Sequence, residues 1–308
     1  MSICPNCFRY NFGVNCYDGA EICAFCGYDL KAKPEASLRL PPGTELKKRY
    51  IIRTESTNDG TYQIYRACDI KKDSEVTVWE LLPPKLEKRM ENGSISFSDE
   101  ETKKKFQQSC DELICKCSII KNLDIEKGML VPLDSFTENG TAYIVTEAIT
   151  GDTLLDYRSG IGGRLSKREA FTIMLPILKS IGLLNKYDLK HGGVWLSSMY
   201  FTQNGKIKLG ALGNTETAHS DADKTSDIND AGFALFSLIA GGADAHEDEE
   251  PKDISKGTVN DKLAAFGLNK SEAAPIAAAI YSKGSIVETG AMKKLIMRVE
   301  KTLKESRT

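Results

Sequence analysis

The order of predicted strands and helices is the feature that most limits what this chain can fold into. Up to Gly151, runs of β-branched and aromatic residues separated by polar turns predict strands. One long helix is predicted among them. It begins where Ser98 and Glu101 match a capping-box pattern, and it runs to about Cys117. The predicted strands cover residues 50–52, 62–67, 75–82, 129–136 and 141–147, with turns at 54–61 and 138–140.

The half of the chain after Gly151 is predicted to be mainly helical. Ser166, with Glu169 three residues later, predicts the start of an amphipathic helix that reaches Lys186. One hairpin, at 199–209, is predicted around an Asn-Gly turn. Strands with one helix, followed by helices, are typical of an α+β protein with two lobes, which is the fold class that we expect. The later helices are predicted at 226–240, 260–265, 272–282 and 289–305.

Four cysteines near the N-terminus have the spacing of a metal site. Cys4 and Cys7 form one Cys-x-x-Cys pair, Cys23 and Cys26 form another, and 15 residues separate the pairs. Two thiolates three residues apart on a tight turn can bind one ion, and two such turns complete a tetrahedron. We therefore predict a structural Zn²⁺ site, a zinc ribbon, in residues 1–30, because so short a segment cannot bury a core of its own.

Other interpretations of this segment stay open at the level of the sequence. The cysteines could be reduced free thiols, or one pair could carry out redox chemistry, although the βαβ context of that chemistry is absent. Cys16 is left over from the two pairs and could replace a ligand. Acidic and basic residues are mixed along the segment, so a ribbon that binds nucleic acid is the weaker alternative.

The charge and hydropathy of the whole chain argue against several classes of partner. A net charge of -2 and a pI of about 6.1 provide no general attraction to nucleic acid or to an anionic membrane. The longest apolar stretch, near 231–240, is shorter than the roughly 20 residues that span a bilayer. The N-terminus lacks the basic start and apolar core of a signal peptide. We therefore expect a cytoplasmic protein with no membrane partner.

A connector separates the predicted ribbon from the main domain. Residues 31–43 are rich in proline and polar side chains, which is typical of an extended linker. The main domain is expected to occupy 44–306. Its strand-rich lobe is predicted at about 44–147 and its helical lobe at about 151–306.

The main domain resembles a protein kinase, most closely the bacterial serine/threonine type preceded by a zinc ribbon. Five stretches carry the resemblance in the family's order: the first strand, the lysine strand, the hinge, the two catalytic loops and the central buried helix. In that order they are residues 40–52, 76–83, 138–154, 191–213 and 226–241. The resemblance covers about 40–303 and implies a two-lobed protein-kinase-like fold.

The residues at the phosphoryl-transfer positions are not those that the chemistry needs. This fold uses a glycine-rich loop, a lysine paired with a glutamate, a base aspartate, and an asparagine and an aspartate for magnesium. At the glycine positions stand Thr57, Asp59 and Tyr62, although Gly60 persists. At the lysine, glutamate, base, asparagine and metal-aspartate positions stand Trp79, Ser109, Gly193, Ser198 and Ala211.

These replacements imply a pseudokinase that binds rather than catalyses. The resemblance then implies a scaffold or regulator in bacterial signalling, with protein partners of unknown identity. We expect no ATP or Mg²⁺ as cofactors and one structural Zn²⁺.

Part of the family's architecture is expected to persist. Asp227 matches the buried helix aspartate that holds the catalytic-loop backbone, with a solvent-facing helix cap as the alternative. His191 matches a loop histidine that packs rather than reacts, and Thr146 matches the gatekeeper. Trp79 and Trp195 are expected to be core residues rather than ligand platforms.

Two rival functions stay open. A divergent ATP-dependent kinase or other phosphotransferase would need a carboxylate near the cleft, and Glu80, Asp152 and Asp188 are the candidates. The second rival is a zinc-ribbon protein that binds nucleic acid.

Overall fold

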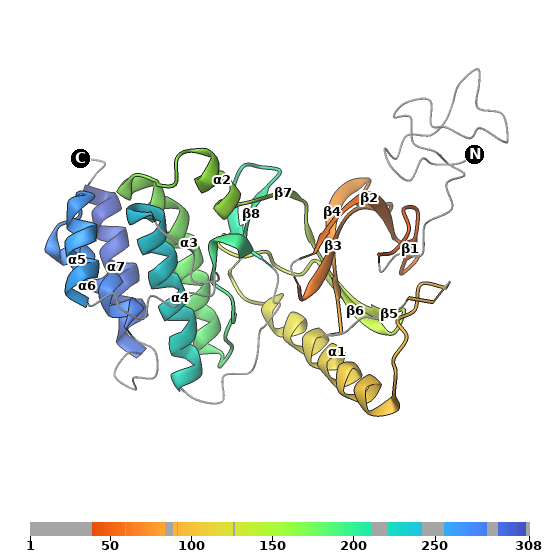
Figure 1. Ribbon diagram of the computed structural model, residues 1–308. Helices are drawn as coiled ribbons and strands as arrows, with labels where there is room; N and C mark the ends of the chain where they lie inside the picture. The colour runs from red at the N-terminus through yellow and green to blue at the C-terminus, as the bar shows by residue number, and fades with distance from the viewer. Residues whose placement is uncertain are drawn as a thin grey trace, which may run out of the picture. The chain divides into compact units, whose positions relative to one another are not determined.

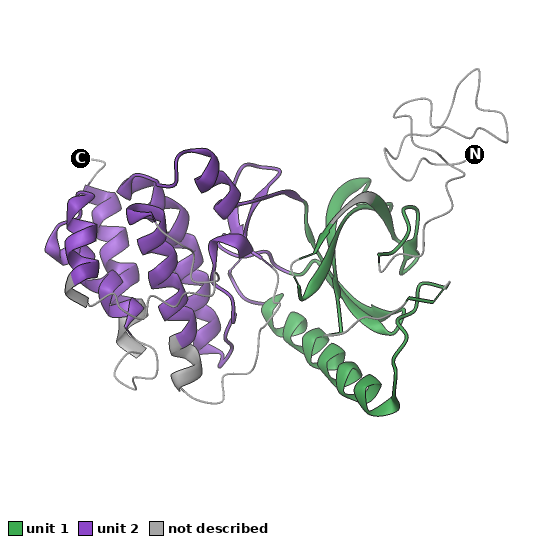
Figure 2. Ribbon diagram, viewed as in Figure 1, with its two compact units in different colours: residues 1–121, 132–148 green, residues 122–131, 149–308 purple. Residues whose placement is uncertain are grey.

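The computed structural model in Figure 1 describes most of the chain after residue 38. The chain forms two compact units (Figure 2): residues 1–121 with 132–148, and residues 122–131 with 149–308. The structure describes residues 39–58, 60–83, 89–90, 92–125, 127–210, 221–241, 256–281 and 289–305, and the two units are presented through these residues.

The first unit contains a six-stranded antiparallel sheet and one helix. The strand order is β1-β2-β3-β4-β6-β5, so the only reversal of chain order is at the last two strands. The helix α1 packs against β5 and β6. The elements are β1 (Glu45–Leu46), β2 (Tyr50–Asn58), β3 (Tyr62–Asp69), β4 (Ser74–Leu81), α1 (Glu100–Ile120), β5 (Asp134–Glu138) and β6 (Thr141–Glu147).

The strand β2 is longer than the sequence predicts. A polar turn was expected at 54–61, but the strand continues to Asn58, which pairs with Gln63 of β3. The register shifts between Ile52 and Ser56, so the polar stretch is accommodated within the strand by an irregularity. Cross-strand pairing therefore overrides the polar composition that predicted a turn.

The turn between β5 and β6 confirms the local prediction, whereas the start of β5 does not. Asn139 and Gly140 have φ angles of 55° and 77°, the left-handed conformation that a tight hairpin needs. The predicted strand at 129–136 is wrong in its first half. Residues 129–131 belong to the second unit, where the amide of Leu130 donates to the carbonyl of Leu209, and β5 begins only at Asp134.

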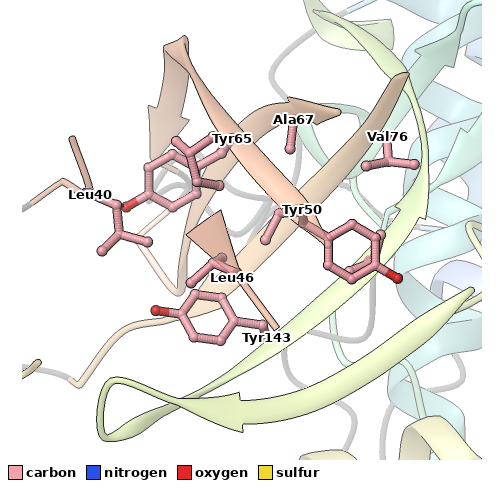
Figure 3. Close-up of a cluster of buried hydrophobic side chains, with 10 residues drawn as sticks. Leu40, Leu46, Tyr50, Tyr65, Ala67, Val76 and Tyr143 are labelled. Carbon is pink, nitrogen blue, oxygen red and sulfur yellow. The ribbon is translucent and has the colours of Figure 1, made fainter. Parts of the chain in front are cut away.

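Side chains alternate across the two faces of the first unit's sheet. Val76 and Val78 of β4 lie on the face that carries the cluster in Figure 3. Trp79, the next residue after Val78, points to the other face. Phe136 extends this cluster by stacking on Tyr50 and on Tyr143, at ring-centroid distances of 6.0 and 5.3 Å. The buried members are Leu40, Leu46, Tyr50, Ile52, Tyr65, Ala67, Val76, Val78, Tyr143 and Val145.

The helix α1 begins one residue later than predicted. Asp99, not Ser98, is the N-cap, because its carboxylate accepts the amide of Thr102 at 2.7 Å. The hydroxyl of Ser98 lies 3.1 Å from the same carboxylate. One face of the helix is buried, and it consists of Phe106, Cys110, Leu113, Cys117 and Ile120.

The second unit is mostly helical and contains a three-stranded sheet in the order β7-β8-β9. The predicted capping box of α3 is confirmed by reciprocal bonds between Ser166 and Glu169. Three elements, β7, α2 and η1, were not predicted, although Thr153 and Asp156 form a second capping box that could have indicated α2. The elements are β7 (Ile149–Thr153), α2 (Leu154–Gly160), α3 (Lys167–Lys186), η1 (Leu196–Ser198), β8 (Met199–Thr202), β9 (Ile207–Leu209), α4 (Asp221–Ala240), α5 (Lys256–Ala265), α6 (Lys270–Ile280) and α7 (Thr289–Glu305).

Close packing around α3 and α4 explains two glycines. A Cβ at Gly128 would lie 2.1 Å from the carbonyl oxygen of Pro176 in α3, so only glycine lets residues 122–131 approach this helix. A Cβ at Gly232 of α4 would lie 2.8 Å from the amide nitrogen of Ile280 at the end of α6. Gly232 therefore allows α4 and the end of α6 to pack closely.

Candidate functional site

Trp79 occupies the position that the resemblance gives to the catalytic lysine. It lies on β4, opposite Ile64 of β3 and Ile144 of β6, and its side chain is 1% exposed. Its indole Nε1 donates to Oγ1 of Thr146 at 3.0 Å, which ties the ring to the gatekeeper position. An uncharged ring, fixed by packing and a hydrogen bond, therefore stands at the position where the resemblance expects a lysine.

Tyr62, the first residue of β3, extends this apolar surface. Its side chain is buried, and its ring meets the indole of Trp79 edge-on at 6.1 Å and 88°. Gly60, with a φ of 90°, keeps the loop's left-handed turn, and its amide is bonded to the side chain of Asn58. Of the other two predicted positions, Thr57 is exposed and Asp59 lies outside the described residues.

Ser109, at the position of the paired glutamate, is exposed on α1. Its hydroxyl donates to the carbonyl of Lys105 in the preceding turn, at 3.3 Å. The neighbouring acids Asp111 and Glu112 are exposed as well. Ser109 has no charge with which to anchor the helix to a lysine.

Glu80 was a candidate carboxylate for a divergent enzyme, but it faces the opposite side of β4 from Trp79. Its side chain is fully buried and ion-paired with Arg89, with an Oε2 to Nη2 distance of 2.8 Å. The hydroxyls of Tyr65 and Tyr143 donate to it at 2.8 and 2.6 Å. Burial, and then the nearby charge of Glu80, raise the pKa of both tyrosines well above the usual range.

The loop that matches the catalytic loop is held by Asp227 of α4. Its carboxylate oxygens accept the amides of His191 at 2.7 Å and of Gly192 at 2.8 Å, and its side chain is fully buried. Asp227 lies inside α4, which spans Asp221–Ala240, so the alternative of a solvent-facing cap is wrong.

His191 packs within this loop, as predicted. Burial lowers the pKa of His191 despite the neighbouring carboxylate of Asp227. Its Nε2 lies 3.2 Å from the carbonyl oxygen of Gly210, so the neutral ring carries its proton on Nε2 and donates it there. The histidine therefore links the loop to the end of β9.

Gly193, at the position that the resemblance gives to the base, is buried next to Trp195. A Cβ on Gly193 would lie 3.4 Å from the indole ring of Trp195, which is an ordinary van der Waals contact. Trp195 is half-buried and was expected only to be a core residue. Sequence reasoning missed this contact because no local pattern reports which ring lies beside a glycine.

Ser198, at the position of the metal-binding asparagine, is engaged in the same loop. Its hydroxyl donates to the carbonyl of Gly193 at 2.6 Å and accepts the amide of Trp195 at 3.1 Å. Ala211, at the metal-aspartate position, lies outside the described residues. The remaining candidates of the enzyme hypothesis, Asp152 and Asp188, are both exposed.

The structure thus brings together two sets of the predicted residues, one in each unit. Trp79 and Thr146 meet in the first unit, where Tyr62 joins them, and the second set meets in the second unit around Asp227. The members of this second set are His191, Gly193, Ser198 and Asp227.

The predicted zinc ligands Cys4, Cys7, Cys23 and Cys26 lie outside the described residues, as does Cys16. Among the residues that are described, no group of three or more histidine, cysteine or acidic side chains could hold a metal ion. The described part of the chain also has no helix that combines the length and the apolar character needed to cross a bilayer.

Comparison with known proteins finds a likeness among solved structures. No protein-family model matches this chain, and no curated protein matches it. Among solved structures, the chain is similar to "PpkA-294 apo form", a bacterial serine/threonine kinase, with a TM-score of 0.64 and 20% sequence identity. The likeness covers 87% of this chain and 100% of that chain. The chain therefore has a protein-kinase-like fold.

Proposed function

We propose that this protein is a pseudokinase, which uses a kinase-like fold to bind other proteins as a scaffold or regulator and does not transfer phosphate. The observation that carries the proposal is the buried Trp79. Its indole, hydrogen-bonded to Thr146, occupies the position of the lysine that would pair with nucleotide phosphates.

Electrostatics supports this proposal. A triphosphate loses its hydration on binding, and it needs cations and hydrogen-bond donors to replace the water. The buried pair of Trp79 and Tyr62 offers an apolar surface instead. A nucleotide placed against this surface would keep the cost of desolvation without the compensating charge.

The loop of the second unit supports it independently. With Gly193 in place of the base, no side chain at that position can accept the proton of a substrate hydroxyl. The hydroxyl of Ser198 is bonded within the loop, and serine is a poor substitute for the asparagine that binds magnesium.

The further parts of the proposal follow from the sequence alone. We propose that Cys4, Cys7, Cys23 and Cys26 bind one structural Zn²⁺, that the protein is cytoplasmic, and that its partners are proteins rather than nucleic acid. The position of the ribbon ahead of the kinase-like domain suits a module that adds a second contact surface for a partner.

A thermal-shift experiment on the full chain tests the absence of nucleotide binding. A ligand at 100 times its dissociation constant stabilises a folded protein by about 2.7 kcal/mol, which raises the melting temperature measurably. We expect no shift with millimolar ATP and Mg²⁺. A control with ADP or with ATP and EDTA separates a magnesium-dependent effect from a salt effect. A saturable, magnesium-dependent shift would instead favour the divergent phosphotransferase.

A further inference from the structure

The first unit buries an ion pair on the face of β4 opposite Trp79. The side chains of Glu80 and Arg89 are 0% and 3% exposed. Arg89 donates Nη1 to Oε1 at 3.0 Å and Nη2 to Oε2 at 2.8 Å, in the two-pronged geometry that fixes orientation as well as distance. Each carboxylate oxygen also accepts one tyrosine hydroxyl, Tyr143 on Oε1 and Tyr65 on Oε2.

The two tyrosines belong to the core cluster of the sheet. Tyr65 on β3 and Tyr143 on β6 are both drawn in Figure 3, where Leu40 lies beside Tyr65. The hydroxyl of Tyr65 accepts the amide of Leu40 at 2.9 Å. Glu80 is therefore held from both neighbouring strands, and it presents a rigid carboxylate to Arg89.

Arg89 in turn organises the segment between β4 and α1. Its Nη1 also donates to the carbonyl of Gly93 at 2.7 Å, and its backbone forms a bridge with Ile95. The amide of Ile95 donates to the carbonyl of Asn139 in the β5–β6 turn at 2.9 Å. The described residues 89–90 and 92–97, named here the lead-in segment, are thus attached to the sheet at several points.

The lead-in segment passes directly into α1. The ring of Phe97 lies 5.5 Å from the ring of Phe106, which is on the buried face of the helix. The N-cap Asp99 follows two residues after Phe97. Glu80 therefore connects to the first turns of α1 in three steps. It pairs with Arg89, Arg89 bridges to Ile95, and the chain runs from Ile95 to Phe97, whose ring contacts Phe106 of α1.

We propose that the Glu80–Arg89 pair sets the position of α1. In an active kinase a lysine on the sheet and a glutamate on the helix do this on the nucleotide side. Here Trp79 and Ser109 carry no charge, and the tie runs over the opposite face of the sheet. This inference rests on the proposed function in one respect: Trp79 and Ser109 do not form the lysine–glutamate ion pair of an active kinase. A tie that includes no cleft residue keeps α1 in one place with or without nucleotide.

The chemistry of the pair suits a positioning role. A buried ion pair contributes little net stability compared with a well-packed apolar pair, because both charges lose their hydration. Its geometry is directional, however, and an apolar pair cannot reproduce it. Glu80 and Arg89 are therefore positioning residues, and their replacement is expected to loosen the helix start rather than to unfold the unit.

Hydrogen–deuterium exchange on the full chain tests the proposal. The variant carries Glu80→Leu with Arg89→Met, which removes both charges together. We expect the amides of residues 95–106 to exchange about tenfold faster than in the wild type, while those of β3 and α3 stay within about twofold. The matched control is Arg49→Met with Asp69→Leu, which removes another two-pronged pair of the same sheet, with bonds of 2.8 and 2.7 Å. The control is expected to leave 95–106 unchanged.

Two results would overturn the proposal: unchanged exchange at 95–106 in a folded double variant, or an equal increase in the control. If the double variant does not fold, Arg89→Lys replaces it, because a lysine keeps the charge and loses the two-pronged geometry. The same faster exchange is then expected, and an unchanged rate counts against the pair. Binding of ATP to the wild type without any change at α1 would contradict the proposed function alone and would leave the proposal on Glu80 and Arg89 intact.

Discussion

At the scale of residues, the two faces of β4 differ in their chemistry. Trp79, which we propose stands at the lysine position, is buried on one face, and the next residue, Glu80, carries a buried charge on the opposite face. Successive side chains of a strand point to opposite faces, so these neighbours belong to different environments. The indole seals one face, and the carboxylate connects the other to the segment before α1.

Substitutions of Trp79 test whether its site is an apolar slot. Trp79→Ala is expected to lower the free energy of unfolding by about 3–5 kcal/mol, because it leaves a cavity, and Trp79→Phe by less. Trp79→Lys should destabilise at least as much as Trp79→Ala, because the ammonium group would be buried without a partner. Urea unfolding measures all three. A Trp79→Lys variant as stable as the wild type would show that the slot opens to water.

Asp69 provides a prediction on pH dependence. The two-pronged hydrogen bond from Arg49 holds the pKa of Asp69 below its usual range. A carboxylate whose pKa is lower in the folded state contributes stability above its unfolded pKa of about 3.9, and that contribution is lost as the pH falls through the folded value. Asp69→Asn should therefore destabilise the protein more at pH 7 than at pH 3.

The measurement is urea unfolding of Asp69→Asn and the wild type at both pH values. The exposed Asp152 offers a matched control, since Asp152→Asn should give the same small effect at each pH. An equal loss of stability at both pH values in Asp69→Asn would contradict the account of this ion pair.

At the scale of elements, the start of α1 distinguishes two candidate caps. The carboxylate of Asp99 accepts the amide of Thr102, whereas Ser98 only contacts Asp99. Asp99→Ala should lower the melting temperature by a few degrees, because a helix amide loses its partner. Ser98→Ala should change it by less than about one degree. The reverse order in calorimetry would restore the cap that the sequence predicted.

Local chemistry explains which elements could be predicted. The Asn139-Gly140 turn and the Ser166 capping box depend on residues within four positions of each other, and both are confirmed. The length of β2 depends on pairing with β3, and the placement of residues 129–131 depends on a contact with Leu209. Patterns within a short window carry no information on such partners, which explains these two errors.

The candidate site follows the same division. The order of the resembling stretches was sufficient to predict a buried Trp79, a packed His191 and a buried Asp227 that holds a loop, and the structure shows these environments. The contact of Trp195 with Gly193 and the pairing of Glu80 with Arg89 were not predicted. Both depend on side-chain directions in the folded state, which the sequence of one chain does not show.

At the scale of the whole molecule, the chain has a protein-kinase-like fold, and we propose that its phosphoryl-transfer positions have become structural. The buried Asp227 holds the backbone of its loop, which is consistent with this proposal. The zinc site at Cys4, Cys7, Cys23 and Cys26 stays a prediction. Proteins of one fold perform many functions, so the proposal depends on these particular positions.

The two tryptophans of the chain provide the most direct measurement, because they stand on the two sets of candidate residues. ATP with Mg²⁺ would be titrated into a Trp195→Phe variant, which reports on Trp79 alone, and into a Trp79→Phe variant, which reports on Trp195. If the protein does not bind nucleotide, as we propose, the emission of both indoles stays constant up to millimolar nucleotide. A saturable change in emission that requires Mg²⁺ would contradict it and would show that the kinase-like fold still binds nucleotide.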